Sequence, residues 1–431
     1  MKNRVVPCRY ARARDPRAGA AFRGTLLAVA LAAAGSLGAT ETSILVSPNV
    51  APAAEMAYAV GVDGTWIVVG APGEDTITGA AYAIDCATLP CANAVRIVPD
   101  DIQPDDAFGT AVGISGDTLV ATAPGPEPGA AYIYVRDAGG WTQQARLTPS
   151  GGSSGERFGA SASLSGDRVA IGAERAGNQA GAVYVFVRTG TSWIQEARLT
   201  AADALPHDAL GSSVSLDGDT LLAGAPIKDR PAGGSYANGA AYVFTHDAGG
   251  WAQQAKLLPA SGANGILFGF AVDVAGDRAV IGAPYALSGQ GTAYVFSRSG
   301  TEWSQQTQLD AAAGAAGDEF GWSVALGDDR VVVGAPFAGQ AIEAACGASY
   351  VFEGPTFVET GASAIAQPML NELAGWSVAA SGSRWVVSAP GHVVGVNDHA
   401  GAAYWFDSTI TIFRSGFELA AQAQCVPEED D

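Results

Sequence analysis

Short apolar runs separated by glycine recur along most of the chain. The stretch from Arg157 to Phe186, RFGASASLSGDRVAIGAERAGNQAGAVYVF, contains three such runs, divided by a Gly-Asp pair and by a longer polar segment. Apolar runs of this length, rich in β-branched residues and bounded by turn residues, predict β-strands. We therefore expect three short strands here. The glycines are expected to serve tight turns and close backbone approach, and not to cradle a phosphate.

The same pattern returns in seven copies, about 50 residues apart, which marks the chain as a repeat protein. The copies have an FG-like pair, a GAP-like triplet and a GAxY sequence, in that order, except that the first copy lacks the FG pair and the seventh keeps only its glycine, Gly375. The GAxY tyrosines are Tyr82, Tyr132, Tyr184, Tyr242, Tyr294, Tyr350 and Tyr404. A fourth run of the form Trp-x-Gln-x-x-x-Leu follows in four copies, at 141–147, 193–199, 251–257 and 303–309. Its alternation predicts an outer strand with one solvated face.

Seven units of four short strands, each burying its faces on its neighbours, predict an all-β fold, a seven-bladed β-propeller of four-stranded antiparallel blades. We place it at residues 41–413. To close the ring, Ser43–Val46 is expected to pair beside the last blade, whose final strand is expected at Thr409–Phe413. The Gly-Asp pairs at 166–167, 218–219 and 276–277 are expected to form two-residue hairpin turns with positive φ.

These landmarks resemble the FG-GAP repeat family, whose best-known members form the β-propeller head of integrin α subunits. The resemblance covers roughly residues 57–406 and implies an extracellular propeller used for adhesion or ligand binding. Integrin-like copies often carry an aspartate-rich calcium loop, so calcium is possible by family analogy. Here those loops are cut to SGDR, DGDT, AGDR and GDDR. One or two carboxylates cannot supply the six to eight oxygens that calcium takes, so we expect turn-forming aspartates and no cofactor or metal.

The two ends of the chain differ from the repeats. Residues 1–40 combine seven basic residues, the apolar run 25–37 and small residues, which is the order of a secretory signal peptide. Residues 414–431 form an acidic tail. We expect an exported protein, either extracellular or in the periplasm and cell envelope, that is monomeric and has no membrane span. Asp and Glu number 43 against 23 Lys and Arg, which disfavours nucleic acid as a partner.

Four cysteines remain after the predicted signal peptide, and an oxidising destination favours disulfides. Cys86 and Cys91 bracket a hairpin-sized loop and are expected to pair. Cys346 would then pair with Cys425 and attach the acidic tail to the propeller.

Loop lengths predict where the protein binds. Turns between the first and second strands and between the third and fourth are short, whereas the connections after GAP and between blades are long and differ in every copy. Both long sets emerge on one face, and variable loops on a rigid scaffold often carry binding. The candidate ligand-binding residues are Lys228, Asp229, Arg230 and Tyr236 in the fourth copy and His392, Asn397, Asp398 and His399 in the seventh.

The sequence favours a binding or adhesion module for an extracellular protein or glycan, since no catalytic motif is present. The alternative is a carbohydrate-active enzyme, a glycosidase or lyase, that uses carboxylates near the funnel of the propeller. Its candidate residues are Asp105, Asp106, Glu156, Asp318 and Glu319. A purely structural component of the cell envelope is a third possibility.

Overall fold

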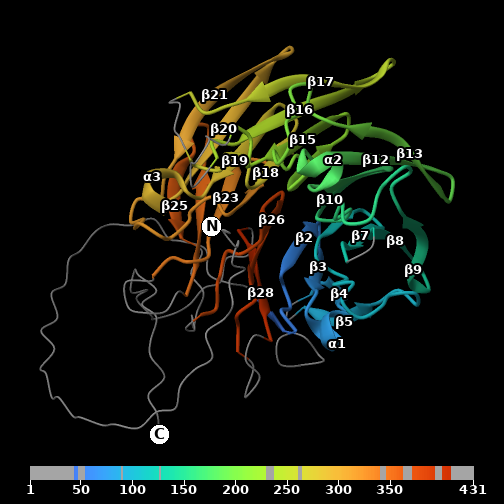
Figure 1. Ribbon diagram of the computed structural model, residues 1–431. Helices are drawn as coiled ribbons and strands as arrows, with labels where there is room; N and C mark the ends of the chain where they lie inside the picture. The colour runs from blue at the N-terminus through green and yellow to red at the C-terminus, as the bar shows by residue number, and fades with distance from the viewer. Residues whose placement is uncertain are drawn as a thin grey trace, which may run out of the picture. The chain divides into compact units, whose positions relative to one another are not determined.

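The structure of the protein is a computed structural model, and it forms a ring of seven four-stranded antiparallel sheets (Figure 1). It describes residues 43–46, 54–88, 91–125, 128–229, 237–260, 265–339, 346–362, 371–393 and 400–408. All of these residues belong to one compact unit, Ser36–Asp431. The predicted signal peptide and acidic tail lie outside the described residues. No helix within them has the length and apolar character that crossing a membrane requires.

Six blades are built from consecutive strands, numbered from the innermost outwards. Blade 1 consists of β2 (Ala59–Asp63), β3 (Trp66–Ala71), β4 (Ala80–Asp85) and β5 (Ala92–Ile97). Blade 2 consists of β6 (Val112–Ser115), β7 (Thr118–Ala123), β8 (Ala130–Asp137) and β9 (Gly140–Leu147). Blade 3 consists of β10 (Ser161–Ser165), β11 (Arg168–Ala173), β12 (Ala182–Thr189) and β13 (Ser192–Leu199).

Blades 4 to 6 continue the same order. Blade 4 consists of β14 (Ser213–Asp217), β15 (Thr220–Ala225), β16 (Ala240–Asp247) and β17 (Gly250–Leu257). Blade 5 consists of β18 (Val272–Ala275), β19 (Arg278–Ala283), β20 (Thr292–Ser299) and β21 (Glu302–Leu309). Blade 6 consists of β22 (Ser323–Leu326), β23 (Arg330–Ala335), β24 (Ala348–Glu353) and β25 (Val358–Ala362). The fold class predicted from the repeats is confirmed.

Blade 7 closes the ring with a strand from the other end of the propeller. Its order is β26 (Val378–Ser381), β27 (Arg384–Ala389), β28 (Ala402–Asp407) and β1 (Ser43–Val46), which pairs antiparallel with β28. The prediction that Ser43–Val46 pairs in the last blade is confirmed. The prediction of a separate final strand at Thr409–Phe413 is wrong in position, because β1 itself occupies the place beside β28; residues 409–413 lie outside the described residues.

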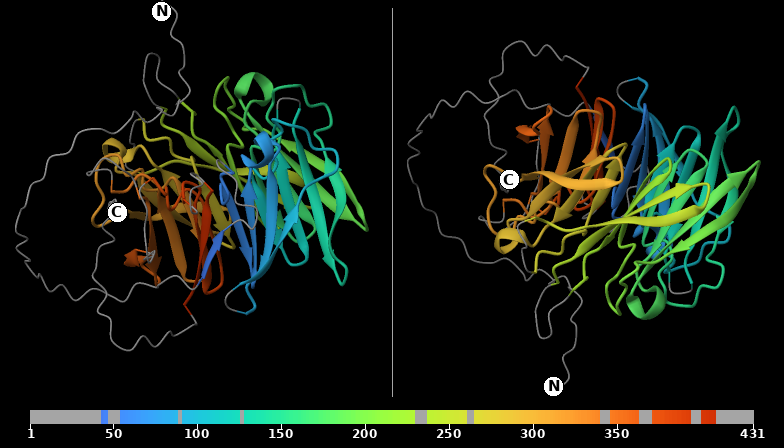
Figure 2. Two further views of the ribbon diagram at one scale, coloured as in Figure 1. Left: turned by 90° about the horizontal axis from the view of Figure 1, so that it is seen from below. Right: turned by 90° about the horizontal axis from the view of Figure 1, so that it is seen from above.

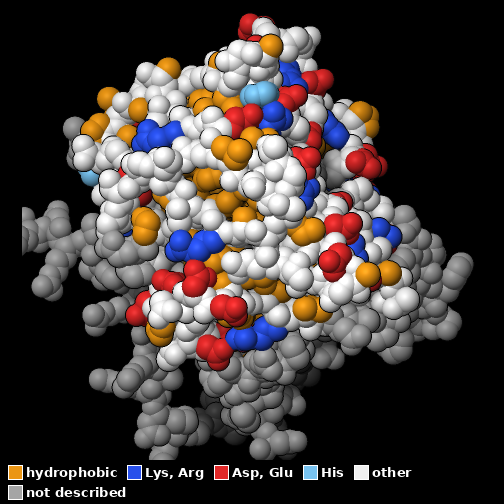
Figure 3. Space-filling view, turned by 90° about the vertical axis from the view of Figure 1, so that its right-hand side faces the viewer, with side chains coloured by type: hydrophobic (Ala, Val, Ile, Leu, Met, Phe, Trp, Pro, Cys, Tyr) orange, Lys and Arg blue, Asp and Glu red, His pale blue; other side chains and the backbone are white. Residues whose placement is uncertain are grey.

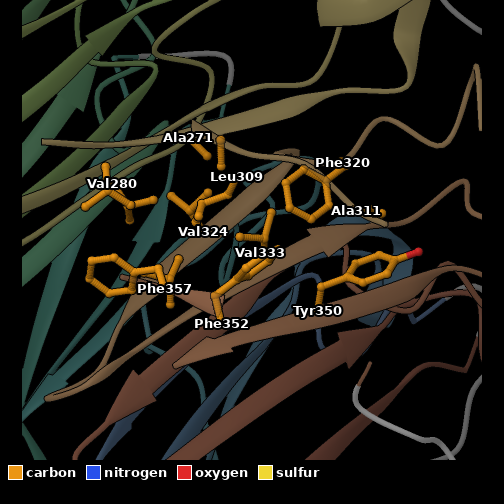
Figure 4. Packing of buried hydrophobic residues seen from close by; sticks show 14 of the residues in the cluster. Ala271, Val280, Leu309, Ala311, Phe320, Val324, Val333, Tyr350, Phe352 and Phe357 are labelled. Carbon is orange, nitrogen blue, oxygen red and sulfur yellow. The ribbon is translucent and has the colours of Figure 1, made fainter. Parts of the chain in front are cut away.

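The hydrophobic core consists of layers between adjacent sheets. In Figure 4, Val324, Val333 and Phe352 of blade 6 lie with Val280 and Leu309 of blade 5 in one such layer. The second strand of each blade is buried at nearly every position, as in β23, because a neighbouring sheet covers both of its faces. Figure 2 shows the successive sheets side by side around the ring. This stacking accounts for the continuously apolar inner strands and the alternating outer ones.

The recurring glycines lie where one blade touches the next. A Cβ atom on Gly291, the first residue of GAxY in blade 5, would lie 2.0 Å from the carbonyl oxygen of Phe320 in blade 6. A Cβ atom on Gly282, from the GAP triplet of blade 5, would lie 2.0 Å from the carbonyl oxygen of Gly321. Equivalent close approaches recur between the other blades. The FG, GAP and GAxY landmarks therefore meet at each interface, and their glycines permit the contact.

The innermost strands are joined across blades by side chains that accept backbone amides. Ser163 of β10 accepts from the amide of Leu216 in β14, over 3.0 Å. Ser215 of β14 accepts from Val274 in β18, over 3.1 Å. The edge of each innermost strand has no further strand to pair with, so these bonds satisfy amides that would otherwise depend on water. Ser377 of blade 7 accepts from Val60 of blade 1 in the same way, over 3.3 Å, which continues the pattern across the closure.

The Trp-x-Gln runs join the outer strands. Trp193 of β13 donates its indole N–H to Gln144 of β9, over 2.9 Å, and Trp303 of β21 donates to Gln254 of β17, over 2.8 Å. Gln195, two residues after Trp193, accepts the amide of Ser150 in the connection between blades 2 and 3. The Trp-x-Gln run therefore links adjacent blades through hydrogen bonds at their outer edges. This structural role explains why the run recurs, and no ligand is needed to account for it.

Candidate binding face

The long connections all emerge at one end of the strands, which we call the loop face. Because neighbouring strands in a blade are antiparallel, the connections between second and third strands lie at the same end as those between blades. The opposite face carries the tight turns, in which Gly166, Gly218 and Gly276 have φ of 55°, 54° and 57°. The predicted positive φ at these glycines is confirmed.

Aspartates of the tight turns are engaged in ion pairs within the blades. Asp167 Oδ1 accepts from Arg188 Nε over 2.6 Å, and Asp277 Oδ1 accepts from Arg298 Nε over 2.8 Å. In each pair the arginine lies at the end of the third strand of the same blade. These carboxylates therefore fasten the turn to the sheet. Within the described residues, no group of three or more His, Cys, Asp or Glu side chains is arranged to hold a metal ion.

Three connections on the loop face contain a single helical turn: α1 (Glu74–Ile77), α2 (Ala176–Gln179) and α3 (Ala286–Gly289). The sequence predicts loops at these places. Each turn contains consecutive residues in the left-handed region, such as Leu287 and Ser288 with φ of 52° and 62°. Residues other than glycine rarely adopt this backbone conformation, so contacts with the surrounding structure must hold these connections in place.

In blade 4, the predicted binding residue Lys228 is buried. It is 2% exposed, and its ammonium donates to the carbonyl oxygen of Asp203 over 2.6 Å and to the carboxylate of Asp208 over 2.9 Å. Although burial raises the pKa of Asp203, hydrogen bonds from Lys256 and Tyr242 lower it to about 2. This ion network holds the connection in place, so the prediction that Lys228 is presented at the surface is wrong. Asp229 is 47% exposed, and Arg230 and Tyr236 lie outside the described residues.

In blade 7, the predicted binding residue His392 is also buried. Its Nδ1 lies 2.8 Å from Oε1 of Glu372, and the hydroxyl of Tyr404 donates to the same oxygen. Glu372 is 0% exposed and precedes the innermost strand of the blade. The prediction that His392 is displayed on the loop is therefore wrong, because it belongs to a buried polar cluster. Asn397, Asp398 and His399 lie outside the described residues.

Most of the carboxylates assigned to the enzymatic alternative have structural partners. Asp106 accepts the amide of Gln103 over 2.8 Å, and Asp318 accepts the amide of Ala315 over 2.7 Å, so each caps a turn of the connection before its blade. Glu156 accepts from the hydroxyl of Tyr184 over 3.1 Å. Asp105 is exposed. These four side chains lie in the connections before the innermost strands of blades 2, 3 and 6, and none of them lines the central channel.

Glu319 differs from the other candidate carboxylates. Its Oε2 atom is buried and has no hydrogen-bonding partner. Burial raises the pKa of Glu319 to about 7, and a hydrogen bond with Tyr285 acts in the opposite direction. A carboxyl group with a pKa near neutrality is suited to donate or accept a proton. Among these carboxylates, Glu319 is therefore the candidate for general acid–base catalysis.

The central channel has a volume of about 380 Å³ and is lined by the innermost strands. Its lining is mostly small and apolar, and Asp273 of β18 is the charged side chain in it. Oδ1 of Asp273 accepts from the hydroxyl of Ser215 over 2.6 Å, and Oδ2 accepts from the amide of Leu326 over 2.7 Å. Burial raises the pKa of Asp273, against these hydrogen bonds. The carboxylate bridges blades 4, 5 and 6, which is a structural role.

A group of aromatic side chains lies at the mouth of the channel on the loop face, and we call it the aromatic arc. It consists of Tyr58, Phe270, Trp322, Phe337 and Trp376. All five are partly exposed. The sequence prediction missed this group; its signal is the residue that follows the FG-like pair, which is aromatic in blades 5, 6, 7 and 1.

A disulfide joins Cys86 and Cys91, as expected. It closes the connection between β4 and β5 on the face opposite the loop face. Cys346 is also disulfide-bonded, and its predicted partner, Cys425, lies outside the described residues.

Comparison with known proteins identifies the repeats. The model of the FG-GAP repeat matches residues 92–134, 141–186, 193–244, 251–296 and 303–352. Each match contains the outer strand of one blade and the three inner strands of the next, for example β9 with β10, β11 and β12. In this frame β1 belongs with β2, β3 and β4, which explains why it forms the outer strand of blade 7.

No curated protein matches the chain. Among solved structures, the crystal structure of Saccharomyces cerevisiae Sqt1 is similar with a TM-score of 0.47 and 11% sequence identity, over 86% of this chain and 99% of that chain. A similarity of this size supports no conclusion on function. The FG-GAP matches together cover more than half of the sequence. The chain belongs to the FG-GAP repeat family.

Proposed function

We propose that the protein is an exported binding module that holds a protein or glycan ligand on its loop face. The observation that carries the proposal is the difference between the two faces of the ring. The opposite face repeats the same tight turns, with equivalent Asp–Arg pairs in blades 2, 3 and 5. The loop face carries connections that differ in every blade, together with the partly exposed aromatic arc. A rigid frame with diverse loops is suited to recognition.

Export is part of this proposal. A disulfide between Cys86 and Cys91 and a second disulfide at Cys346 favour an oxidising compartment. The basic and apolar order of residues 1–40 supplies a signal for secretion.

An enzymatic function is the second candidate, and Glu319 is the observation that favours it. One of its carboxylate oxygens is buried without a partner, and its backbone carbonyl oxygen accepts the amide of Trp322 over 3.1 Å. Glycoside hydrolysis uses two carboxyl groups, however, and the neighbouring Asp318 caps a turn. We therefore favour binding without turnover. Release of reducing ends from polysaccharides by the wild type, lost in E319Q, would instead support the enzyme.

The loop face can be tested by blocking one face at a time. Ala313 is exposed in a connection between blades on the loop face, and Ala248 is exposed in a tight turn on the opposite face. Each is replaced by cysteine and coupled to a 5-kDa-class polyethylene glycol maleimide, and both proteins are applied to arrays of oligosaccharides and of extracellular proteins. The proposal predicts that coupling at A313C suppresses the binding seen with the uncoupled protein, whereas coupling at A248C does not. Suppression only by the A248C adduct would contradict it.

A further inference from the structure

The aromatic arc occupies one structural position in successive blades. Tyr58, Phe270, Trp322 and Trp376 each stand two residues before, or immediately before, the innermost strand of blades 1, 5, 6 and 7. The corresponding residues of blades 2, 3 and 4 are Thr110, Ala160 and Ser212. The propeller thus forms with small side chains at this position in three blades, so packing of the ring does not by itself require aromatic ones. Partly exposed aromatic side chains beyond the needs of folding indicate a binding surface.

The rings of the arc form a continuous surface. Neighbouring ring centroids are 4.6 Å apart for Phe270 and Trp322, 4.9 Å for Trp322 and Trp376, and 5.7 Å for Trp376 and Tyr58. Phe337, from the connection after GAP in blade 6, packs edge-on against Trp322 at 5.5 Å. Rings in such contact leave no space for an ammonium group between them, so the arc is not an aromatic cage for a cation. Neighbouring rings are tilted to one another by 47° to 50°, and each remains partly exposed.

The surroundings of the arc carry little accessible charge. In the described part of the chain, every cation–π contact involves aromatic rings outside the arc. By contrast, acidic and basic side chains lie next to one another on the side of the molecule drawn in Figure 3. The carboxyl group of Glu319, three residues before Trp322, has a hydrogen bond with Tyr285, and its Oε2 atom is buried below the surface of the arc.

We propose that the aromatic arc binds a neutral glycan, by stacking pyranose rings on Trp322 and Trp376. A pyranose ring presents a face of C–H groups that packs on an indole face, and its hydroxyls lie at the edge of that face. The net charge of −20 disfavours acidic polysaccharides. This inference rests on the proposed function and specifies its ligand class.

Titration with defined oligosaccharides tests the inference. The mature protein is titrated with cellohexaose, maltohexaose, xylohexaose, mannohexaose and chitohexaose, with heparin as the anionic probe and hexalysine as the cationic probe, by calorimetry. We expect at least one neutral hexasaccharide to bind, with the affinity reduced about tenfold or more in W322A, since buried Trp anchors dominate such contacts. W322F retains a ring, as Phe270 does in blade 5, and is expected to bind within a few-fold of the wild type. T110A, at the same position of blade 2, is the matched control and should bind as the wild type does.

Three results would overturn the inference. They are the absence of binding by all five neutral hexasaccharides, affinity in W322A equal to that of the wild type, and binding of heparin or hexalysine alone. Thermal unfolding of W322A and W322F shows whether either substitution has disturbed the fold, and W322F keeps the test decisive if W322A does not fold. The failure of this inference can be told apart from the failure of the proposed function. If a protein ligand is blocked by the A313C adduct but binds W322A as it binds the wild type, the loop face remains the binding face and the glycan inference is wrong.

Discussion

The contact between the GAxY glycine and the next blade can be tested by one methyl group. Gly291 has φ of 88°, and a Cβ atom there would lie 2.0 Å from the oxygen and 2.4 Å from the nitrogen of Phe320. Gly300, in the tight turn between β20 and β21, has φ of 65°, and a Cβ atom there would have no heavy atom within 4 Å. G291A and G300A therefore share the cost of a left-handed alanine and differ in the clash.

The magnitude follows from the two geometries. A left-handed alanine costs roughly 1–2 kcal/mol in either variant. G291A must in addition move the backbone of blade 6, which disturbs the hydrogen bond from the amide of Phe320 to the carbonyl oxygen of Gln290, 2.9 Å long. Overpacking costs about 1–3 kcal/mol and the weakened hydrogen bond about 1 kcal/mol more, so we expect G291A to be about 2–4 kcal/mol less stable than G300A.

Urea unfolding followed by circular dichroism and tryptophan fluorescence measures this difference, provided that both signals report one transition. The wild type and both variants are compared at one pH. A loss in G291A that equals the loss in G300A would refute the reasoning, because it would mean that the interface between blades tolerates the methyl group.

Three further predictions concern other parts of the ring. The pKa of Glu319 in the folded protein, about 7, lies above the ordinary value of 4.5, so the folded state binds the proton more tightly than the unfolded state does. The free energy of unfolding should therefore fall as pH rises from 5 to 8, by about 1–3 kcal/mol after allowance for partial exposure. E319Q should lose that dependence in thermal unfolding measured across this range, and an unchanged profile would contradict the burial of the carboxyl. D273A should lower the free energy of unfolding by about 1–3 kcal/mol, because it removes the acceptor of the Leu326 amide. D273S should lower it by less, since Ser215, at the equivalent position of β14, accepts an amide with its hydroxyl. L45D should destabilise blade 7 by more than the roughly 2–5 kcal/mol expected for L45A. Leu45 is buried in the same core cluster as Trp405, and a carboxylate there would be unpaired. Equal urea midpoints for L45D and the wild type would show that β1 does not close the ring.

The sequence was sufficient for the fold because each landmark has a fixed place in the interface between blades. The FG-like pair and the two glycine sequences recur in register, so one copy predicts all seven. The place of the final strand was predicted less well, because the apolar run at 409–413 and Ser43–Val46 are both plausible edge strands. The family repeat begins with an outer strand, and this frame assigns β1 to blade 7.

The candidate site was predicted only in part. The loop face follows from loop lengths, but the burial of Lys228 and of His392 depends on Asp208 and Glu372, which are 20 residues away in each case. A charged residue in a long loop has no pattern that reveals such a partner. The aromatic arc was equally hidden, since Tyr58, Phe270, Trp322 and Trp376 are each more than 50 residues apart in sequence and only the ring brings the first and the last blade together.

The central claim is that ligands bind at the channel mouth on the loop face, and hydrogen–deuterium exchange tests it most directly. The mature protein is exchanged with and without a saturating concentration of the neutral hexasaccharide that binds it most tightly. The account predicts slower exchange in peptides that contain Tyr58, Trp322 and Trp376, and no change in the tight turns at 137–140 and 247–250. Protection confined to those turns, or to the outer strands, would contradict it.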